Sequence, residues 1–124
     1  MANEMHDIYD PGRDITGRAT AAVTGKRFLK ISGNRTGGNI AVAPCAAGDR
    51  SCGVAKYDAA SGDIVGVARG NSRVVRVTAG AALAAGDEVQ AGAGGVAIVA
   101  AAGAKLGYAL TAAANGADAE ISLY

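Results

Sequence analysis

The sequence has few of the side chains from which active sites and aromatic binding surfaces are built. Of its 124 residues none is tryptophan, one is phenylalanine, four are tyrosine, and His6 is the only histidine. A catalytic triad or a Cys–His pair would need that histidine, which lies in a polar terminal segment. A structural zinc site needs a tetrahedral set of ligands that one histidine and two cysteines do not complete. We therefore expect no enzyme activity, no cofactor and no metal site.

Neither sign of charge dominates, because 12 basic and 11 acidic side chains leave a net charge of +1. A nucleic-acid module would show a basic face, and the densest basic stretch, Lys26–Lys30, favours instead a strand with a solvated face. No apolar run approaches the roughly 18 residues that cross a bilayer, and the first residues lack the features of a signal peptide. We expect no nucleic-acid or membrane partner, and synthesis in the cytoplasm.

The chain has two cysteines, Cys45 and Cys52, separated by a short polar stretch. A cytoplasmic origin favours free thiols. A hairpin that brought the two residues together would also permit a disulfide in a protein later exposed outside the cell. The sequence leaves both states open.

Small side chains are abundant: half of the residues are hydrophobic, most of these being alanine and valine, and 19 residues are glycine. Small apolar side chains bury little area, and glycine loses much conformational entropy on folding. We therefore expect a monomer of marginal stability that completes its burial on a partner or on copies of itself.

Short β-type runs closed by glycine recur from Thr20 onward. The clearest are residues 28–32, 40–43, 63–69, 73–78 and 120–124. The alanine-rich stretch 79–86 has no helical apolar stripe, so we expect a loop with at most one helical turn despite the helix propensity of alanine. The pattern predicts an all-β fold, a small barrel or sandwich.

The sequence also repeats itself at an offset of 54 residues. The matched segments are Ala22–Gly25 with Arg76–Ala79, Leu29 with Leu83, Gly53–Ala55 with Gly107–Ala109, Ala59–Gly62 with Ala113–Gly116, and Val67 with Ile121. Two copies are too few for a solenoid, which needs about three repeats. We predict a single β domain over residues 19–124, built from two similar halves at about 20–70 and 74–124.

Residues 1–18 are polar and aperiodic, which predicts an extended N-terminal arm. A disordered, solvated terminus would not need the apolar side chains found here, so we expect an arm that becomes ordered on binding. The candidate contact residues of this arm are Met5, Ile8, Tyr9, Pro11 and Arg13.

The segments that suggest a family are Tyr9–Gly12, Ala21–Ser32, Gly53–Asp63, Val77–Val89, Leu106–Leu110 and Glu120–Tyr124. In their order and spacing they resemble the small capsid cement (decoration) proteins of tailed bacteriophages. The resemblance implies a structural protein on the outer surface of the mature virion capsid, where it bridges major capsid subunits and associates with itself as a homotrimer. It implies no catalytic residues, and synthesis in the cytoplasm of the host bacterium. The Cys45–Cys52 loop is not part of the family's pattern.

Two other functions remain open. A small β-barrel that serves as a ligand-binding or adhesive module would need an apolar pocket or an aromatic patch, for which four tyrosines and one phenylalanine supply little. A minor head-fibre or tail component would keep the virion setting and differ in copy number.

Overall fold

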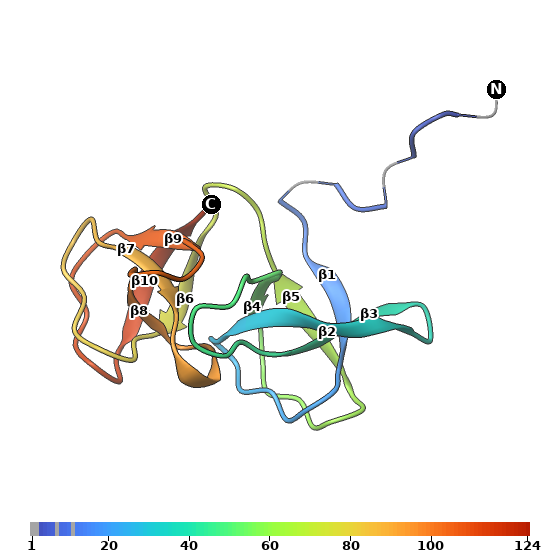
Figure 1. The fold of residues 1–124 in the computed structure, drawn as a ribbon, viewed down its shortest axis with the longest axis horizontal. Helices are drawn as coiled ribbons and strands as arrows, with labels where there is room; N and C mark the ends of the chain where they lie inside the picture. Colours follow the sequence, from blue (N-terminus) through green and yellow to red (C-terminus); the bar gives the residue numbers. More distant parts are fainter. Residues whose placement is uncertain (1–2, 7, 11) are drawn as a thin grey trace.

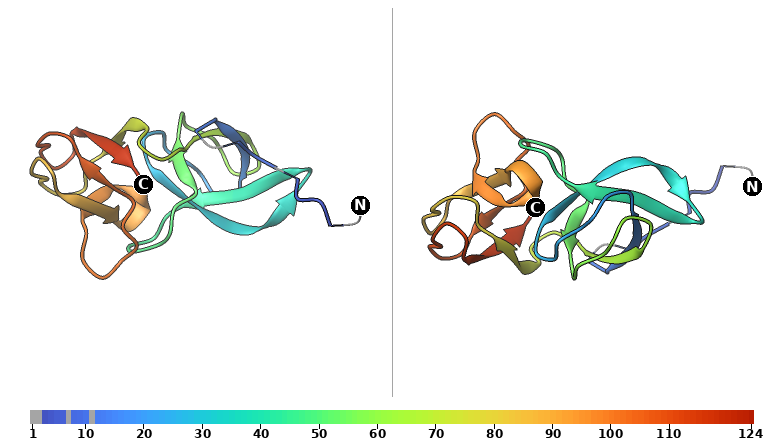
Figure 2. Two further views of the ribbon diagram at one scale, coloured as in Figure 1. Left: turned by 90° about the horizontal axis from the view of Figure 1, so that it is seen from above. Right: turned by 90° about the horizontal axis from the view of Figure 1, so that it is seen from below.

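The structure, a computed structural model, describes residues 3–6, 8–10 and 12–124. Its body consists of two β lobes, and the N-terminal segment projects from the first (Figures 1 and 2). The first lobe is a closed barrel in the order β1-β3-β2-β4-β5, formed by β1 (Ile15–Ala19), β2 (Phe28–Thr36), β3 (Asn39–Pro44), β4 (Gly53–Ala55) and β5 (Ile64–Ala68). The second is a sheet in the order β6-β10-β9-β7-β8, formed by β6 (Val74–Thr78), β7 (Glu88–Ala91), β8 (Ala97–Val99), β9 (Gly107–Ala109) and β10 (Asp118–Leu123).

The all-β prediction is confirmed, with a barrel in the first lobe. Within the described part of the chain the only helical element is the 3-10 turn η1 (Ala93–Gly95). The alanine-rich stretch 79–86 forms a loop. Strand β1 begins at Ile15, so the last residues of the range expected to form the arm already pair with β3 and β5.

The two lobes share one topology. The antiparallel pairs β1–β5 and β2–β4 of the first lobe have counterparts in β6–β10 and β7–β9 of the second. The parallel pairing of β1 with β3 has a smaller counterpart, a single bridge between Ala79 and Ala97. The second sheet therefore has the same strand order as the barrel, and the single bridge between Ala79 and Ala97 joins its two edge strands.

Equivalent residues are not a constant 54 positions apart. Leu29 pairs with Gly53 and Val89 pairs with Gly107, so Leu29 corresponds to Val89, which lies 60 positions later. The expected match of Leu29 with Leu83 is therefore wrong. The expected match of Ala22–Gly25 with Arg76–Ala79 is also wrong, because Val23 bridges to Ala59 as Leu83 bridges to Ala113, which makes Leu83 the counterpart of Val23. The offset of 54 holds from Gly53 onward, where Gly53 corresponds to Gly107.

Five of the six positions by which the offset changes come from the length of one hairpin, and the sixth comes from the segment after it, residues 43–52 against 98–106. Ile31 pairs with Val42 in the first lobe, and the equivalent pair in the second is Ala91 with Ala97. Residues 32–41 lie between the first pair, whereas only residues 92–96 lie between the second. The longer β2–β3 hairpin extends beyond the barrel (Figure 2).

Each lobe has its own apolar core, and strand β2 contributes to both. Because adjacent strand residues point to opposite faces, Leu29 packs in the barrel core while Phe28 packs in the core of the second lobe. Val54 and Ala55 of β4 divide between the two cores in the same way. Phe28 is fully buried and is the only phenylalanine of the chain. It is the largest side chain that joins the lobes.

Polar contacts also hold the two lobes together. The main-chain N–H of Thr78 donates to the carbonyl of Lys26 at 2.9 Å, and Lys26 Nζ lies 3.0 Å from a carboxylate oxygen of Asp118. Gly95, with φ +85°, lies so close to β2 that a Cβ there would overlap the main chain of Phe28. Lys26, expected on a solvated strand face, thus contributes to the contact between the lobes.

Replacing Phe28 by alanine is expected to lower the free energy of unfolding by about 3–5 kcal/mol, the range for a buried phenylalanine. Urea unfolding followed by circular dichroism measures this loss. The matched control is Ile31→Ala on the same strand. The Ile31 side chain is 54% exposed, so this substitution should lower the free energy of unfolding by less than about 1 kcal/mol. Two separate unfolding transitions in the unmodified protein would show that the lobes unfold independently and that Phe28 does not couple them.

Candidate interaction surface

The N-terminal segment leaves the barrel through a fixed arm root, defined here as residues 9, 10 and 12–14. The Tyr9 ring contacts two guanidinium groups, with Cζ of Arg35 5.6 Å and Cζ of Arg69 5.3 Å from its centroid. Arg35 Nη2 also donates to the Tyr9 hydroxyl at 3.1 Å. Arg35 lies in β2 and Arg69 follows β5, so one aromatic ring contacts two parts of the barrel. Cation–π attraction of this kind holds a ring without burying it.

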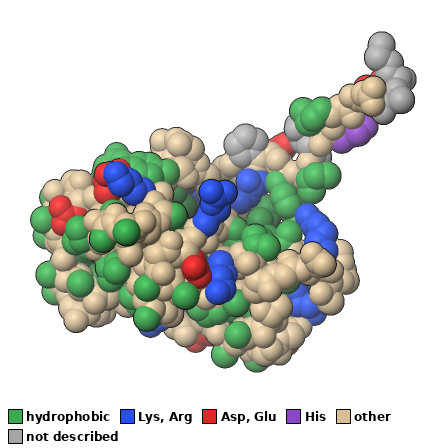
Figure 3. Space-filling view, in the orientation of Figure 1, with side chains coloured by type: hydrophobic (Ala, Val, Ile, Leu, Met, Phe, Trp, Pro, Cys, Tyr) green, Lys and Arg blue, Asp and Glu red, His purple; other side chains and the backbone are tan. Residues whose placement is uncertain are grey.

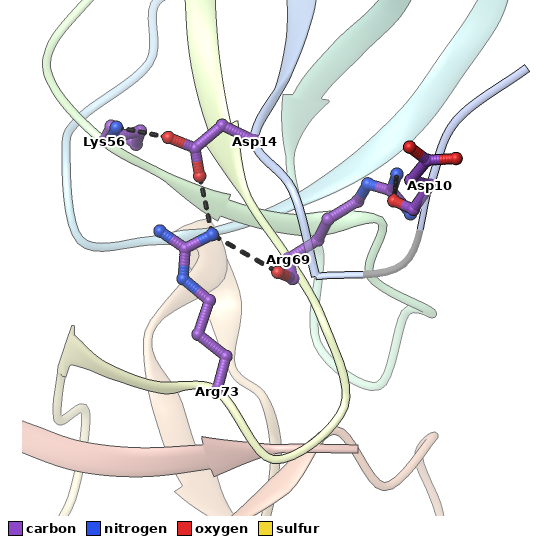
Figure 4. A network of polar contacts seen from close by, with 5 residues as sticks. All are labelled: Asp10, Asp14, Lys56, Arg69 and Arg73. Atoms are coloured by element: carbon purple, nitrogen blue, oxygen red, sulfur yellow. Dashed lines mark hydrogen bonds and ion pairs between the residues drawn. The ribbon is translucent and has the colours of Figure 1, made fainter.

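A polar network fixes the other end of the arm root (Figure 4). One carboxylate oxygen of Asp14 accepts from Lys56 Nζ at 2.5 Å and the other from Arg73 Nη1 at 2.6 Å. Arg73 Nη1 also donates to the carbonyl of Arg69 at 3.3 Å, and Arg69 Nη2 donates to the carbonyl of Asp10 at 2.5 Å. The network thus connects the arm root to the linker between the lobes, residues 69–73.

The hydrogen bonds from Lys56 and then Arg73 hold the pKa of the Asp14 carboxyl below its usual value of 3.8. The carboxylate is therefore ionised at neutral pH. All three side chains are partly exposed, so added salt weakens their attraction.

The backbones of the arm root and the linker also touch. Gly70 has φ +129°, and a Cβ at this position would lie 2.5 Å from Cα of Gly12. Any side chain at Gly70 would therefore displace the arm root.

Beyond the root the arm extends into solvent (Figure 3). Met5 is 79% and Ile8 is 73% exposed. Arg13 lies in the root, where its Nε is 3.6 Å from a carboxylate oxygen of Asp10. Of the predicted contact residues, Met5 and Ile8 are therefore exposed on the arm and Tyr9 and Arg13 belong to its root, while Pro11 lies outside the described residues.

Sequence reasoning missed the barrel side of the arm root. Its residues are Arg35, Lys56, Arg69 and Arg73, which are scattered over 39 positions and carry no local motif. No motif in the sequence marks Asp14 either. Only the closure of the barrel brings these side chains together.

Both cysteines are free thiols in the structure. Burial is the main cause that raises the pKa of the Cys45 thiol to about 12 and that of the Cys52 thiol to about 11. The Cys45 thiol donates weakly to the carbonyl of Arg50 at 3.8 Å.

The described residues contain no group of His, Cys, Asp and Glu side chains that could hold a metal ion. None of the helices in this part of the chain is long and apolar enough to cross a membrane. Outside the arm, the large apolar side chains that are exposed lie on both lobes: Ile31, Tyr57, Ile64, Val74, Val99, Tyr108, Leu110 and Tyr124.

A duplicated β body with an arm that is fixed at its root and exposed at its tip is suited to attachment on a larger surface. The chain belongs to the phage cement protein family, whose model matches residues 9–123. The family expected from the sequence is thus confirmed. The protein is a structural component of the phage capsid, which it binds and on which it is located.

Among solved structures, the chain is similar to the head fibre gp8.5 N base of bacteriophage phi29. The TM-score is 0.76 at 24% sequence identity, and the match covers 90% of this chain and 93% of the other. At this identity the likeness establishes the fold. Comparison with curated proteins found no match.

Replacing Asp14 by asparagine is expected to release the arm root, because two ion pairs are lost together. Lowering the pH should have the same effect. Since the pKa of Asp14 is lowered in the folded protein, its contribution is complete above the usual carboxyl value and is lost as the pH falls through the lowered one. The NMR signals of the Tyr9 ring report this release.

The matched control is Asp63→Asn, an exposed carboxylate in the loop before β5 that should leave the Tyr9 signals unchanged. Tyr9 signals that are identical in Asp14→Asn and the unmodified protein would show that the arm root does not depend on Asp14.

Proposed function

We propose that this protein binds the outer surface of the mature phage capsid and stabilises the shell by linking neighbouring major capsid subunits. The observation that carries the proposal is the arm itself. It is anchored at Tyr9 and Asp14, yet exposes Met5 and Ile8 to solvent. Exposed apolar side chains on a projecting segment gain free energy when a second surface covers them.

A protein of this kind stabilises the mature shell through differential binding. It can shift the shell toward one arrangement only by binding that arrangement more tightly than the others. A site formed where several subunits meet provides such selectivity, because the subunits come into the correct positions only after expansion. Many copies on one shell then add their modest individual affinities through effective concentration.

The arm residues Met5, Ile8, Tyr9, Pro11 and Arg13 are the proposed contacts with a neighbouring subunit of the decorated capsid. Met5 and Ile8 supply apolar surface at the tip of the arm. Tyr9 and Arg13, in the root, set the direction in which the arm leaves the barrel. The arm becomes ordered as it docks, which costs part of the binding free energy.

The remaining parts of the proposal concern the organisation of the chain. The chain acts as one domain, which begins with β1 at Ile15 and not at residue 19, and the residues before Ile15 act as its arm. Copies made in the cytoplasm of the host bacterium assemble on the shell as homotrimers, and no chemical reaction is involved. The position of Phe28 supports a single domain, because the core of the second lobe includes Phe28, Cys45 and Val54 of the first lobe.

A second candidate is a head-fibre base, favoured by the likeness to the phi29 head fibre N base. Such a protein would occupy the capsid surface in fewer copies and carry a further fibre. Copy number on the particle distinguishes the two.

Co-sedimentation with expanded heads that lack the protein tests the proposal. We expect saturable binding of the full chain at hundreds of copies per head and no binding to unexpanded proheads, because the proposed site forms only on expansion. Saturation at a few tens of copies or fewer would favour the fibre base. Failure of the folded protein to bind its own heads would overturn both.

Deleting residues 1–10 is expected to leave the fold intact, since β1 begins at Ile15, and to raise the concentration needed for half-saturation at least about tenfold, the equivalent of 1.4 kcal/mol. Circular dichroism checks the fold and co-sedimentation the binding. The double variant Met5→Gln/Ile8→Gln should show part of this loss. Its matched control is Ile64→Gln, an exposed apolar residue on the barrel. Undiminished binding after the deletion would refute the role of the arm.

A further inference from the structure

Two hollows on the surface meet at the loop between β3 and β4. One, of about 610 Å³, lies beside β2 on the first lobe, and the other, of about 310 Å³, lies between the lobes. Both are lined by Arg50, Ser51 and Cys52. The two hollows therefore lie next to each other along one loop, and together they are called the groove here; two adjacent hollows suit an extended chain segment better than a compact ligand.

The walls of this groove are basic. Lys30, Arg50, Arg69 and Lys105 line it, against the single acidic residue Asp49. Two of the basic groups are already paired, Lys30 with Asp49 at 3.3 Å and Lys105 with a carboxylate outside the groove at 3.2 Å. Arg50 is exposed, and among the described residues its guanidinium has no carboxylate within ion-pair distance.

Arg69 is likewise free of carboxylates in the described part of the chain, and its Nη2 donates to the main-chain carbonyl of Asp10. Between the lobes the accessible apolar lining of the groove comes from the partly exposed Leu106 and the exposed Tyr124, above the buried Phe28 and Leu123. A partner that fits combines carboxylates with apolar side chains, because arginine binds carboxylates through a planar pair of donors.

The N-terminal arm has this composition. Between residues 4 and 8 it carries the acidic residues Glu4 and Asp7 together with Met5 and Ile8. The apolar side chains are exposed in the structure. The eight residues that precede Tyr9 reach at most about 28 Å when fully extended.

The arm of one copy does not lead into its own groove. Tyr9 is held by Arg35 and Arg69, and from there the chain runs away from the second lobe (Figures 1 and 2). The groove lies between the lobes, in the opposite direction. A second copy is therefore the source of an arm that fits.

We propose that the groove around Arg50 receives the N-terminal arm of a neighbouring copy of this chain. Glu4 and Asp7 of the incoming arm face Arg50 and Arg69, and Met5 and Ile8 cover the apolar lining. This inference rests on the proposed function, because neighbouring copies come within reach of one another on the shell, and it names the surface that receives the arm.

The test uses the full chain on expanded heads, with the photoreactive residue p-benzoylphenylalanine in place of Met5. Heads are decorated with an equal mixture of ¹⁵N-labelled and unlabelled protein, irradiated, and analysed by mass spectrometry. We expect cross-links between labelled and unlabelled copies that map to residues 50–53 or 104–106. Arg50→Glu should lower their yield about tenfold, as expected for the loss of a charged contact worth 1.4 kcal/mol.

The matched control is Arg76→Glu, the same change of charge at an exposed arginine of β6 outside the groove, which should leave the yield unchanged. Cross-links to the major capsid protein, cross-links within one copy, or no cross-links on fully occupied heads would each overturn the inference and leave the proposed function intact. Heads that remain undecorated by the unmodified chain would instead show that the proposed function has failed.

Discussion

Strand β2 imposes the constraint on which the rest of the molecule depends. Neighbouring residues of a strand face opposite sides, so Leu29 fills the barrel core while Phe28 fills the core of the second lobe. One strand thereby forms a wall between two cores. A movement of one lobe against the other would expose the largest buried side chain of a protein whose cores otherwise consist mainly of alanine, valine and other aliphatic residues. The lobes therefore hold a fixed relation.

This fixed relation also determines where the arm begins. Its root is bound to Arg69 and Arg73 in the linker between the lobes and to Arg35 and Lys56 on the barrel. The groove lies between the same two lobes. A rigid body therefore sets both the point from which an arm leaves and the place where one can be received. A root that is already ordered reduces the entropy lost on docking to that of the tip.

The fold class and the family follow from the sequence because they depend on local patterns: glycine at the ends of β runs, alternating apolar residues, and the order of low-complexity segments along the chain. The register of the repeat does not follow, because a hairpin of different length in the two lobes leaves no local signal at Leu29. The exposed tip at Met5 and Ile8 could be expected from polarity. Its anchor at Asp14 could not, since Lys56 and Arg73 become its neighbours only when the barrel closes.

The buried thiol of Cys45 and the partly buried thiol of Cys52 bear on how the protein responds to its surroundings. The thiolate is the form that reacts with oxidants and disulfides, and thiols with pKa values of about 12 and 11 are almost wholly protonated near neutrality. Burial therefore lowers the reactivity of Cys45 and Cys52 toward oxidants below that of an exposed thiol. In a particle that passes from a reducing to an oxidising medium, the depth of these two side chains sets how fast their chemistry can change.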